Sequence, residues 1–416
     1  MKVLYLSTTA ELGGAEWCLL DLLGTLRAAR PAWDLEVIAG AEGPLRLEVE
    51  RLGIAGRVAA LPESLARLGD AGLGRRTGRL ALAIRAVGAS PAVAVYLGRL
   101  RRTLAEARPD LIQTNTMKAH VLGALAAPRG VPVLWHLHDY LGPRPAMARV
   151  LRLAARRKSL AVVAVSESVA ADAAATLGPR VPVATIANAI DLKTFRPPIG
   201  DGSDVHDLDA LAGWPTASAG TIRVGLVATF ARWKGHGVFL EAVARLGPAL
   251  PRPCRFYVVG GPIYRSLGSQ WTLAELRARA EALGIADRVG FVGHQTVPAR
   301  ALRALDIVVH ASDRPEPFGR VIVEGMACGR AVIASRLGGA AGLFGDVVEA
   351  LGVPAGDPAA LADALARLLA DDDLRRRLGA AGRRAAVARF DRHQRADSWT
   401  AVYERLVGLR AEGPGR

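Results

Sequence analysis

Two glutamates in the second half of the chain have a spacing that could serve one ligand. Glu316 and Glu324 have seven residues between them; the pattern around them predicts a strand over 304–309 and a helix that opens near Phe318. A helix N-terminus presents free N–H groups and a positive dipole end, which favour an anion such as a diphosphate. Carboxylates accept hydrogen bonds from hydroxyl groups. Phosphate and hydroxyls together describe a nucleotide sugar.

A basic segment offers a second contact for phosphate. Arg232 and Lys234 follow the predicted strand 222–228 and precede the predicted helix 237–246. Lys234 would supply a mobile point charge and Arg232 a bidentate fork. Such charges stabilise the negative charge that grows on a diphosphate leaving group.

Short apolar strands alternating with amphipathic helices predict parallel sheets covered on both faces, hence an α/β fold. They fall into two similar halves, separated by a predicted linker over 199–221 that is rich in Pro, Gly, Asp and Ser. Two doubly wound, Rossmann-like domains are therefore expected, facing a cleft at the carboxyl ends of their strands. The predicted strands are 2–7, 35–39, 111–113, 133–136, 161–165, 183–186, 222–228, 255–259, 289–292, 307–310 and 331–334.

The segment Ser312 to Ala334 resembles the Glu-x7-Glu signature of retaining GT-B glycosyltransferases, in particular glycosyltransferase family 4. The family form is Ser-x-x-Glu-Gly-Phe-Gly, then Glu-Ala-Met-Ala-x-Gly-x-Pro-Val-Ile-Ala; here Glu316-Pro-Phe-Gly319 and Glu324-Gly-Met-Ala-Cys-Gly-Arg-Ala-Val-Ile-Ala stand in register. The resemblance implies a C-terminal helix that crosses back to the first domain. The expected domains are 1–198 with 391–416 for the acceptor, and 222–390 for the nucleotide-sugar donor.

The resemblance also implies a role for individual residues. Glu324 would grip the ribose hydroxyls and Glu316 would lie beside the donor sugar. His138, which shares one strand face with His136, would bond a sugar hydroxyl or place the acceptor. The remaining donor contacts would be the diphosphate contacts of Lys234 and Arg232, the close backbone approach of Gly14, the backbone N–H groups of Phe318, Gly319 and Arg320, and a base contact at Gly293.

The expected reaction is a retaining transfer of a sugar from a nucleoside-diphosphate sugar to an acceptor hydroxyl. We recognise no Asp-x-Asp element of the kind that binds the metal in metal-dependent glycosyltransferases, so neither a metal nor another cofactor is expected. Two departures from the family pattern, Thr229 where Arg is common and Gly342 where Glu is common, favour a weakened nucleotide-sugar-binding protein as one alternative. A sugar-nucleotide epimerase is another. A Rossmann oxidoreductase would need Gly-x-Gly-x-x-Gly after the first strand, which is not there.

The acceptor follows from composition and from the family. Lys+Arg total 54 against Asp+Glu 39, a net charge of +15, and no nucleic-acid motif accompanies this charge. The N-terminus shows no signal-peptide pattern and three scattered cysteines suit a reducing compartment, so a cytoplasmic protein is expected. A glycan or lipid-linked acceptor is expected. The basic groups either dock on an anionic membrane surface or form a solvated basic face. The basic groups that would dock are Arg75, Arg76, Arg79, Arg85, Arg99, Arg101 and Arg102, and then Arg149, Arg152, Arg156, Arg157 and Lys158.

Overall fold

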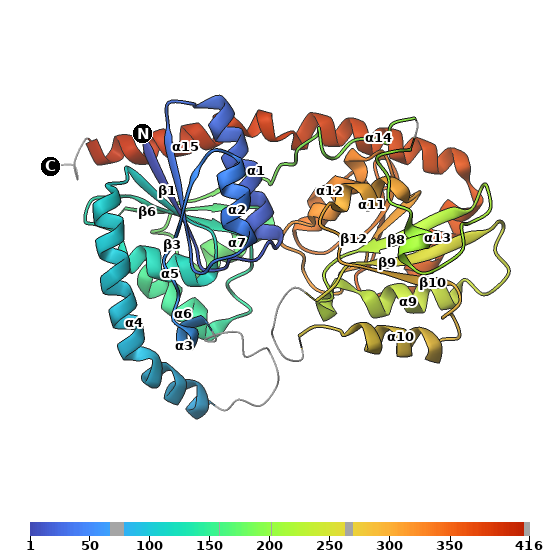
Figure 1. Cartoon of the computed structure of the whole chain (residues 1–416), viewed down its shortest axis with the longest axis horizontal. Coiled ribbons are helices and arrows are strands. Elements are labelled where there is room, and N and C mark those ends of the chain that lie inside the picture. The colour runs from blue at the N-terminus through green and yellow to red at the C-terminus, as the bar shows by residue number, and fades with distance from the viewer. Residues whose placement is uncertain (67–78, 158, 201, 263–268, 412–416) are drawn as a thin grey trace. The chain divides into compact units, whose positions relative to one another are not determined.

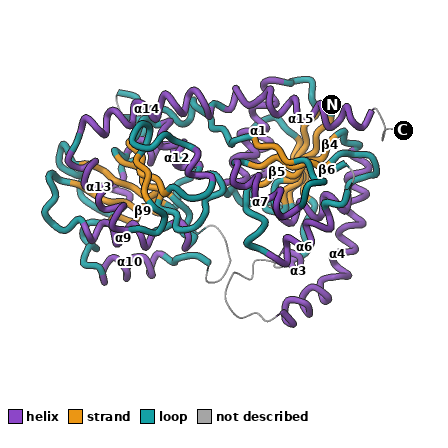
Figure 2. Tube along the Cα trace, turned by 180° about the vertical axis from the view of Figure 1, so that it is seen from behind, coloured by secondary structure: helices purple, strands orange, loops and turns teal. Residues whose placement is uncertain are grey.

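The structure, a computed structural model, describes residues 1–66, 79–157, 159–200, 202–262 and 269–411. It divides into two compact units, one of Met1–Ala189 with Arg392–Arg416 and one of Ile190–Asp391. Each unit holds one parallel sheet with helices on both faces, as Figure 1 and, from behind, Figure 2 show. The predicted pair of doubly wound α/β domains is confirmed.

The sheet of unit 1 has the strand order β3-β2-β1-β4-β5-β6-β7. Its central strands are runs of buried, mostly apolar residues, as a parallel sheet covered on both faces requires. The strands are β1 (Lys2–Ser7), β2 (Asp34–Ala39), β3 (Ala55–Val58), β4 (Leu111–Thr114), β5 (Val133–Leu137), β6 (Leu160–Ala164) and β7 (Val183–Thr185). The helices are α1 (Gly14–Ala29), α2 (Pro44–Arg51), α3 (Glu63–Ala66), α4 (Arg79–Ala107), α5 (Met117–Ala126), α6 (Pro145–Ala154), α7 (Glu167–Leu177), η3 (Arg392–Arg395) and α15 (Ala396–Ala411).

The sheet of unit 2 has the same kind of order, β10-β9-β8-β11-β12-β13. In both sheets the order reverses after a central strand, between β1 and β4 and between β8 and β11, and such points are where doubly wound sheets bind ligands. The strands are β8 (Ile222–Val227), β9 (Cys254–Val259), β10 (Val289–Gly293), β11 (Ile307–His310), β12 (Ala331–Ser335) and β13 (Leu351–Val353). The helices are α8 (Leu208–Leu211), η1 (Arg232–Lys234), α9 (His236–Arg245), α10 (Leu273–Ala282), α11 (Pro298–Ala304), α12 (Arg320–Ala327), η2 (Gly339–Gly342), α13 (Pro358–Ala370) and α14 (Asp372–Phe390).

The C-terminal helix α15 joins unit 1, as the predicted fold requires. Trp399 and Tyr403 of α15 are buried in one apolar cluster with Tyr5 of β1 and Leu134 of β5. Figure 1 shows α15 running along the side of this sheet. The last helix is therefore part of the core of the first unit.

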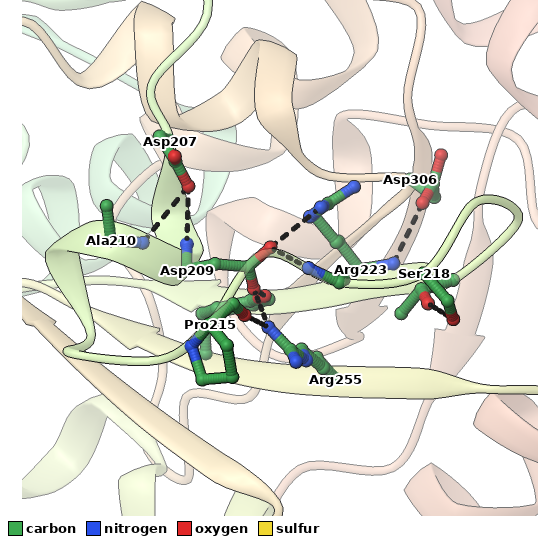
Figure 3. Close-up of polar contacts among 11 residues, drawn as sticks. Asp207, Asp209, Ala210, Pro215, Ser218, Arg223, Arg255 and Asp306 are labelled. Atoms are coloured by element: carbon green, nitrogen blue, oxygen red, sulfur yellow. Dashed lines mark hydrogen bonds and ion pairs between the residues drawn. The ribbon is translucent and has the colours of Figure 1, made fainter.

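The segment 199–221 differs from the expected linker, because it belongs to unit 2 and contains α8. Asp209 anchors the segment: it is 1% exposed and accepts hydrogen bonds from Arg223 at 2.8 Å and from Arg255 at 2.5 Å (Figure 3). It also accepts a hydrogen bond from Tyr257. These partners start or line β8 and β9. The composition of the segment is that of a loop, but one buried carboxylate fastens it to the sheet.

Several element boundaries also differ from the sequence prediction. The short edge strands β3 and β13 were not predicted. Helices α13 and α14 are separated only by Asp371, which ends the first and caps the second. Helix α12 begins at Arg320, after Gly319 with φ +96°. Of the predicted basic face, Arg75, Arg76 and Lys158 lie outside the described residues, and so do the side chains of Arg79 and Arg85. In the part of the chain that is described, no helix is long and apolar enough to cross a bilayer.

Candidate functional site

Two chain segments meet where the strand order of unit 2 reverses. The chain leaves β8 through η1, which ends in Lys234, and leaves the neighbouring strand β11 after His310. Gly235 lets the two segments touch: its φ is +77°, and a Cβ there would lie 1.8 Å from the carbonyl oxygen of Ala311. Asp313 N–H also donates to the Trp233 carbonyl at 3.0 Å. Only glycine fits at position 235, and the fit brings Lys234 to the loop that carries Glu316.

Lys234 and Glu316 form the centre of this site. The Lys234 ammonium donates to both carboxylate oxygens of Glu316, at 2.9 and 2.8 Å, and the two side chains are 21% and 7% exposed. Ser312 donates to the same carboxylate at 2.7 Å, and His310 Nε2 lies 3.2 Å from it. Ser335, at the end of β12, lies 3.2 Å from His310 Nδ1. Three adjacent strand ends thus contribute to one buried polar cluster.

This cluster keeps Glu316 ionised. Burial alone would raise the pKa of the carboxyl, but the charge of Lys234 and the hydrogen bond from His310 outweigh burial and hold the pKa well below its usual range. The backbone of Glu316 is fixed as well, because its N–H donates to Leu337 and its carbonyl accepts from Gly339. A buried, fixed carboxylate can accept a hydrogen bond from a ligand hydroxyl but has no proton to donate.

The second glutamate of the pair lies on α12. Glu324 accepts a hydrogen bond from Arg320 Nε at 3.1 Å, and both side chains are largely buried. Phe318 is buried against Phe390, with ring centroids 6.1 Å apart, and fixes the turn into the helix. The structure therefore places Phe318 and Gly319 directly before α12, Arg320 at its first position and Glu324 one turn further on; the predicted contacts of their N–H groups with phosphate stay a prediction.

Arg232 and Lys234 bind different partners. Its guanidinium donates to Glu275 of α10 at 2.6 Å and stacks over Trp271 at 4.1 Å from the ring centroid. These contacts hold Arg232 against α10, and its predicted contact with a diphosphate stays a prediction. Gly293 ends β10 with φ +76°, and its carbonyl accepts from Gly260 N–H at 2.9 Å, so the ends of β9 and β10 meet at this glycine.

The predicted residues of unit 1 also come together. Gly14 is the first residue of α1, and the Ala15 carbonyl that follows accepts from Asn115 Nδ2 at 2.9 Å. The Oδ1 atom of Asn115 lies 3.2 Å from Nε2 of His138, just past β5. Glu16 of α1 is buried, and its carboxylate accepts a hydrogen bond from Gly13 N–H at 3.1 Å. Burial raises the pKa of Glu16 to about 7.

Several residues of both clusters were missed by the sequence prediction. In unit 2 these are His310 and Ser335, and in unit 1 the residue is Glu16. Ser312 begins the motif segment but was given no role of its own. Most are polar residues at or near the carboxyl ends of predicted strands, which is a usable signal in a parallel sheet. Among the described residues, no group of three His, Cys, Asp or Glu side chains is arranged to hold a metal ion.

Comparison with known families matches both halves of the chain. The family described as Glycosyltransferase Family 4 matches residues 12–194, and the family described as Glycosyl transferases group 1 matches residues 217–385. Among curated proteins, a D-inositol 3-phosphate glycosyltransferase of Xylanimonas cellulosilytica is 36% identical over 226 residues, 53% of this chain and 51% of the relative. The chain thus matches about half the length of such relatives.

Solved structures match over nearly the whole chain. HepE of Anabaena in complex with UDP and glucose has a TM-score of 0.78 and 26% identity, covering 97% of this chain and 99% of HepE. HepE has also been solved with UDP-glucose, at a TM-score of 0.77 and with the same identity. A sucrose-phosphate synthase of Thermosynechococcus elongatus, at 22% identity and a TM-score of 0.74, covering 98% of this chain and all of that one, has the same fold.

Proposed function

Because the chain belongs to glycosyltransferase family 4 and has the GT-B fold, we propose that it is a retaining glycosyltransferase that uses a UDP-sugar as donor. The observation that carries the proposal is the pairing of Lys234 with ionised Glu316 where the sheet order of unit 2 reverses. The nucleotide in the HepE complexes supports uracil as the base.

In the proposed reaction Lys234 does the electrostatic work. Its ammonium has three N–H donors, so it can contact a diphosphate while it keeps a hydrogen bond to Glu316. The charge on the leaving UDP grows in the transition state, and a fixed ammonium in a partly buried site stabilises that charge. Glu316 accepts a hydrogen bond from a hydroxyl of the donor sugar, and Glu324 accepts hydrogen bonds from the ribose. This division of roles needs no resident metal.

The proposed acceptor is a glycan or a lipid-linked sugar at a membrane surface, in polysaccharide or glycolipid assembly. Helix α6 of unit 1 supports this, because Val150 and Leu153 are 46% and 62% exposed beside the exposed Arg149 and Arg152. Arg157 is not part of such a surface, since it donates to carbonyls of Ala124, Ala127, Pro128 and Val131. In a flotation assay, vesicles of anionic lipid should carry the protein upward at low salt and release it at high salt. If the protein does not float at low salt, the proposed binding to a membrane surface is wrong.

Thermal unfolding with UDP, GDP, ADP, CDP and NAD tests the donor site, on the wild type and on Glu324→Ala. UDP at 100 times its dissociation constant should raise the midpoint by roughly 5–10 °C, and Glu324→Ala should lose most of this shift.

A transfer assay tests the reaction itself. Incubation with UDP-glucose and a hydroxyl acceptor should release UDP, with the anomeric configuration of the product read by NMR. A shift with NAD alone would refute the proposal. UDP binding without transfer would favour a binding protein, and conversion of the donor sugar without an acceptor would favour an epimerase.

A further inference from the structure

A buried chain of polar side chains crosses the sheet of unit 1 on the face covered by α15. The hydroxyl of Tyr403 donates to Gln113 Oε1 at 2.5 Å, and the hydroxyl of Tyr5 lies 3.3 Å from that of Tyr403. Gln113 Nε2 in turn lies 3.5 Å from Nδ1 of His136. All four side chains are at most 2% exposed. Buried polar atoms are costly unless they are paired. Each of these contacts needs one donor and one acceptor, so the order of the contacts fixes which atom donates.

The direction of donation determines the tautomer of His136. Because Gln113 Oε1 accepts from Tyr403, its amide NH₂ faces His136 and donates to Nδ1. Nδ1 is then an acceptor, and the ring proton lies on Nε2, for which the described residues offer no hydrogen-bond partner. Burial lowers the pKa of His136 well below its usual value, so the ring is neutral and has a single tautomer to select.

His136 lies directly against His138. The two ring centroids are 4.1 Å apart with planes tilted by 54°, and the ring of Trp399 from α15 meets His136 edge-on at 4.7 Å. On its other side His138 is held by Asn115, which is tied to the Ala15 carbonyl. His138 is therefore confined between Asn115 and the ring of His136. Because the His136 ring is neutral, it adds no charge repulsion to this contact.

We propose that Tyr403 is a positioning residue of the transfer reaction: through Gln113 it sets the Nε2–H tautomer of His136, and this ring holds His138 in its working orientation. The role of His138 in transfer rests on the proposed function; the control of His136 by Tyr403 does not. The C-terminal helix then has a function beyond packing, since its Tyr403 supplies the first hydrogen-bond donor of this network of side chains.

Tyr403→Phe removes this donor and keeps the buried ring, and Tyr5→Phe is the matched control. Both variants lose one buried hydroxyl, but Tyr5 lies beyond Tyr403, so its loss leaves the bond to Gln113 intact. In ¹⁵N-histidine-labelled protein, with the His136 signals assigned by His136→Gln, the two ring-nitrogen shifts report the tautomer. We expect Nε2–H in the wild type and in Tyr5→Phe, and a mixture of tautomers in Tyr403→Phe. Gln113→Leu should give the same mixture, and it replaces Tyr403→Phe if that variant does not fold.

Activity is the second readout. We expect Tyr403→Phe to lower kcat about 10-fold with the donor KM unchanged, because misplacing a positioned group slows only the chemical step. Tyr5→Phe should stay within about 2-fold of the wild type. An unchanged tautomer in Tyr403→Phe, or an equal loss of kcat in Tyr5→Phe, would overturn the inference. If the wild type transfers no sugar, the proposed function and the role of His138 fall together, and the tautomer comparison alone decides whether Tyr403 controls His136.

Discussion

At the scale of single residues, the site of unit 2 depends on an ion pair between Lys234 and Glu316. Taking two charges out of water is costly, so a pair this buried is favourable only when further hydrogen bonds satisfy it. Ser312 and His310 supply these bonds to Glu316. The carboxylate is therefore held ionised and in place before any ligand arrives, and a bound diphosphate would add a second anion for Lys234 without leaving Glu316 unsupported.

Removing the lysine should expose this dependence. Lys234→Met leaves Glu316 buried without its counter-charge, and we expect the free energy of unfolding at pH 7 to fall by about 2–4 kcal/mol. The folded pKa of Glu316 is depressed, so the stability from the pair is complete above the unfolded pKa of about 4.3 and is lost as the pH falls below it. The difference between wild type and variant should thus be large at pH 7 and narrow below about pH 4.

Urea unfolding at several pH values measures this, with Lys193→Met as the control because Lys193 is exposed. A constant difference from pH 7 to pH 3 would mean that the lost interaction is packing of the lysine stem and not its charge.

Residue identity in this site was only partly accessible from the sequence. Glu316, Glu324 and Lys234 stand in motifs, so their types and spacing indicated a site. His310 and Ser335 stand outside the motif, and Ser312 begins it without an assigned role. The three meet because β11 and β12 are paired in register, Ile307 with Ala331 through His310 with Ala334. Register is a tertiary property that one sequence does not display, and the same holds for the partners of Arg232.

At the scale of elements, apolar periodicity predicted the central strands and missed features set by single contacts. The edge strand β3 contains Gly56 and is half exposed, so neither a buried run nor a clear alternation marks it. The segment 199–221 has loop composition, yet Asp209 anchors it with two guanidinium groups and a phenol. The contacts of this one buried residue therefore fix a segment whose composition predicts a linker.

Asp209→Asn should release this segment from the sheet. The change leaves Arg223 and Arg255 without their shared carboxylate, and we expect unit 2 to lose about 2–3 kcal/mol of stability. The segment should also become open to protease cleavage within 199–221 under native conditions. The control is Asp207→Asn two residues earlier, where Asp207 caps α8 and Asn caps equally well, so little change is expected. Equal protease resistance of Asp209→Asn and the wild type would show that the apolar contacts of the segment, and not Asp209, hold it.

At the scale of the whole molecule, the chain passes between its units twice, at residues 189–190 and 391–392. Unit 1 is therefore discontinuous in sequence and is completed only by the last helix. Trp399 and Tyr403 are 5% and 0% exposed within its core, and loss of one such buried aromatic side chain costs about 3–5 kcal/mol. Unit 2 has a sheet and core of its own, so the two units need not unfold together.

Deleting residues 392–416 should separate the stabilities of the two units. Unit 1 loses α15 and should become marginal or unfolded, whereas unit 2 keeps Lys234, Glu316 and Glu324. In scanning calorimetry the wild type should show a transition of unit 2 whose midpoint UDP raises by roughly 5–10 °C. This shift should survive the deletion, whereas the transition of unit 1 should weaken or disappear. Deleting only 412–416 should change neither. If the longer deletion also abolished the UDP-dependent shift, unit 2 would depend on α15 for its own stability, and the view of unit 2 as an independent folding unit with its own donor site would be wrong.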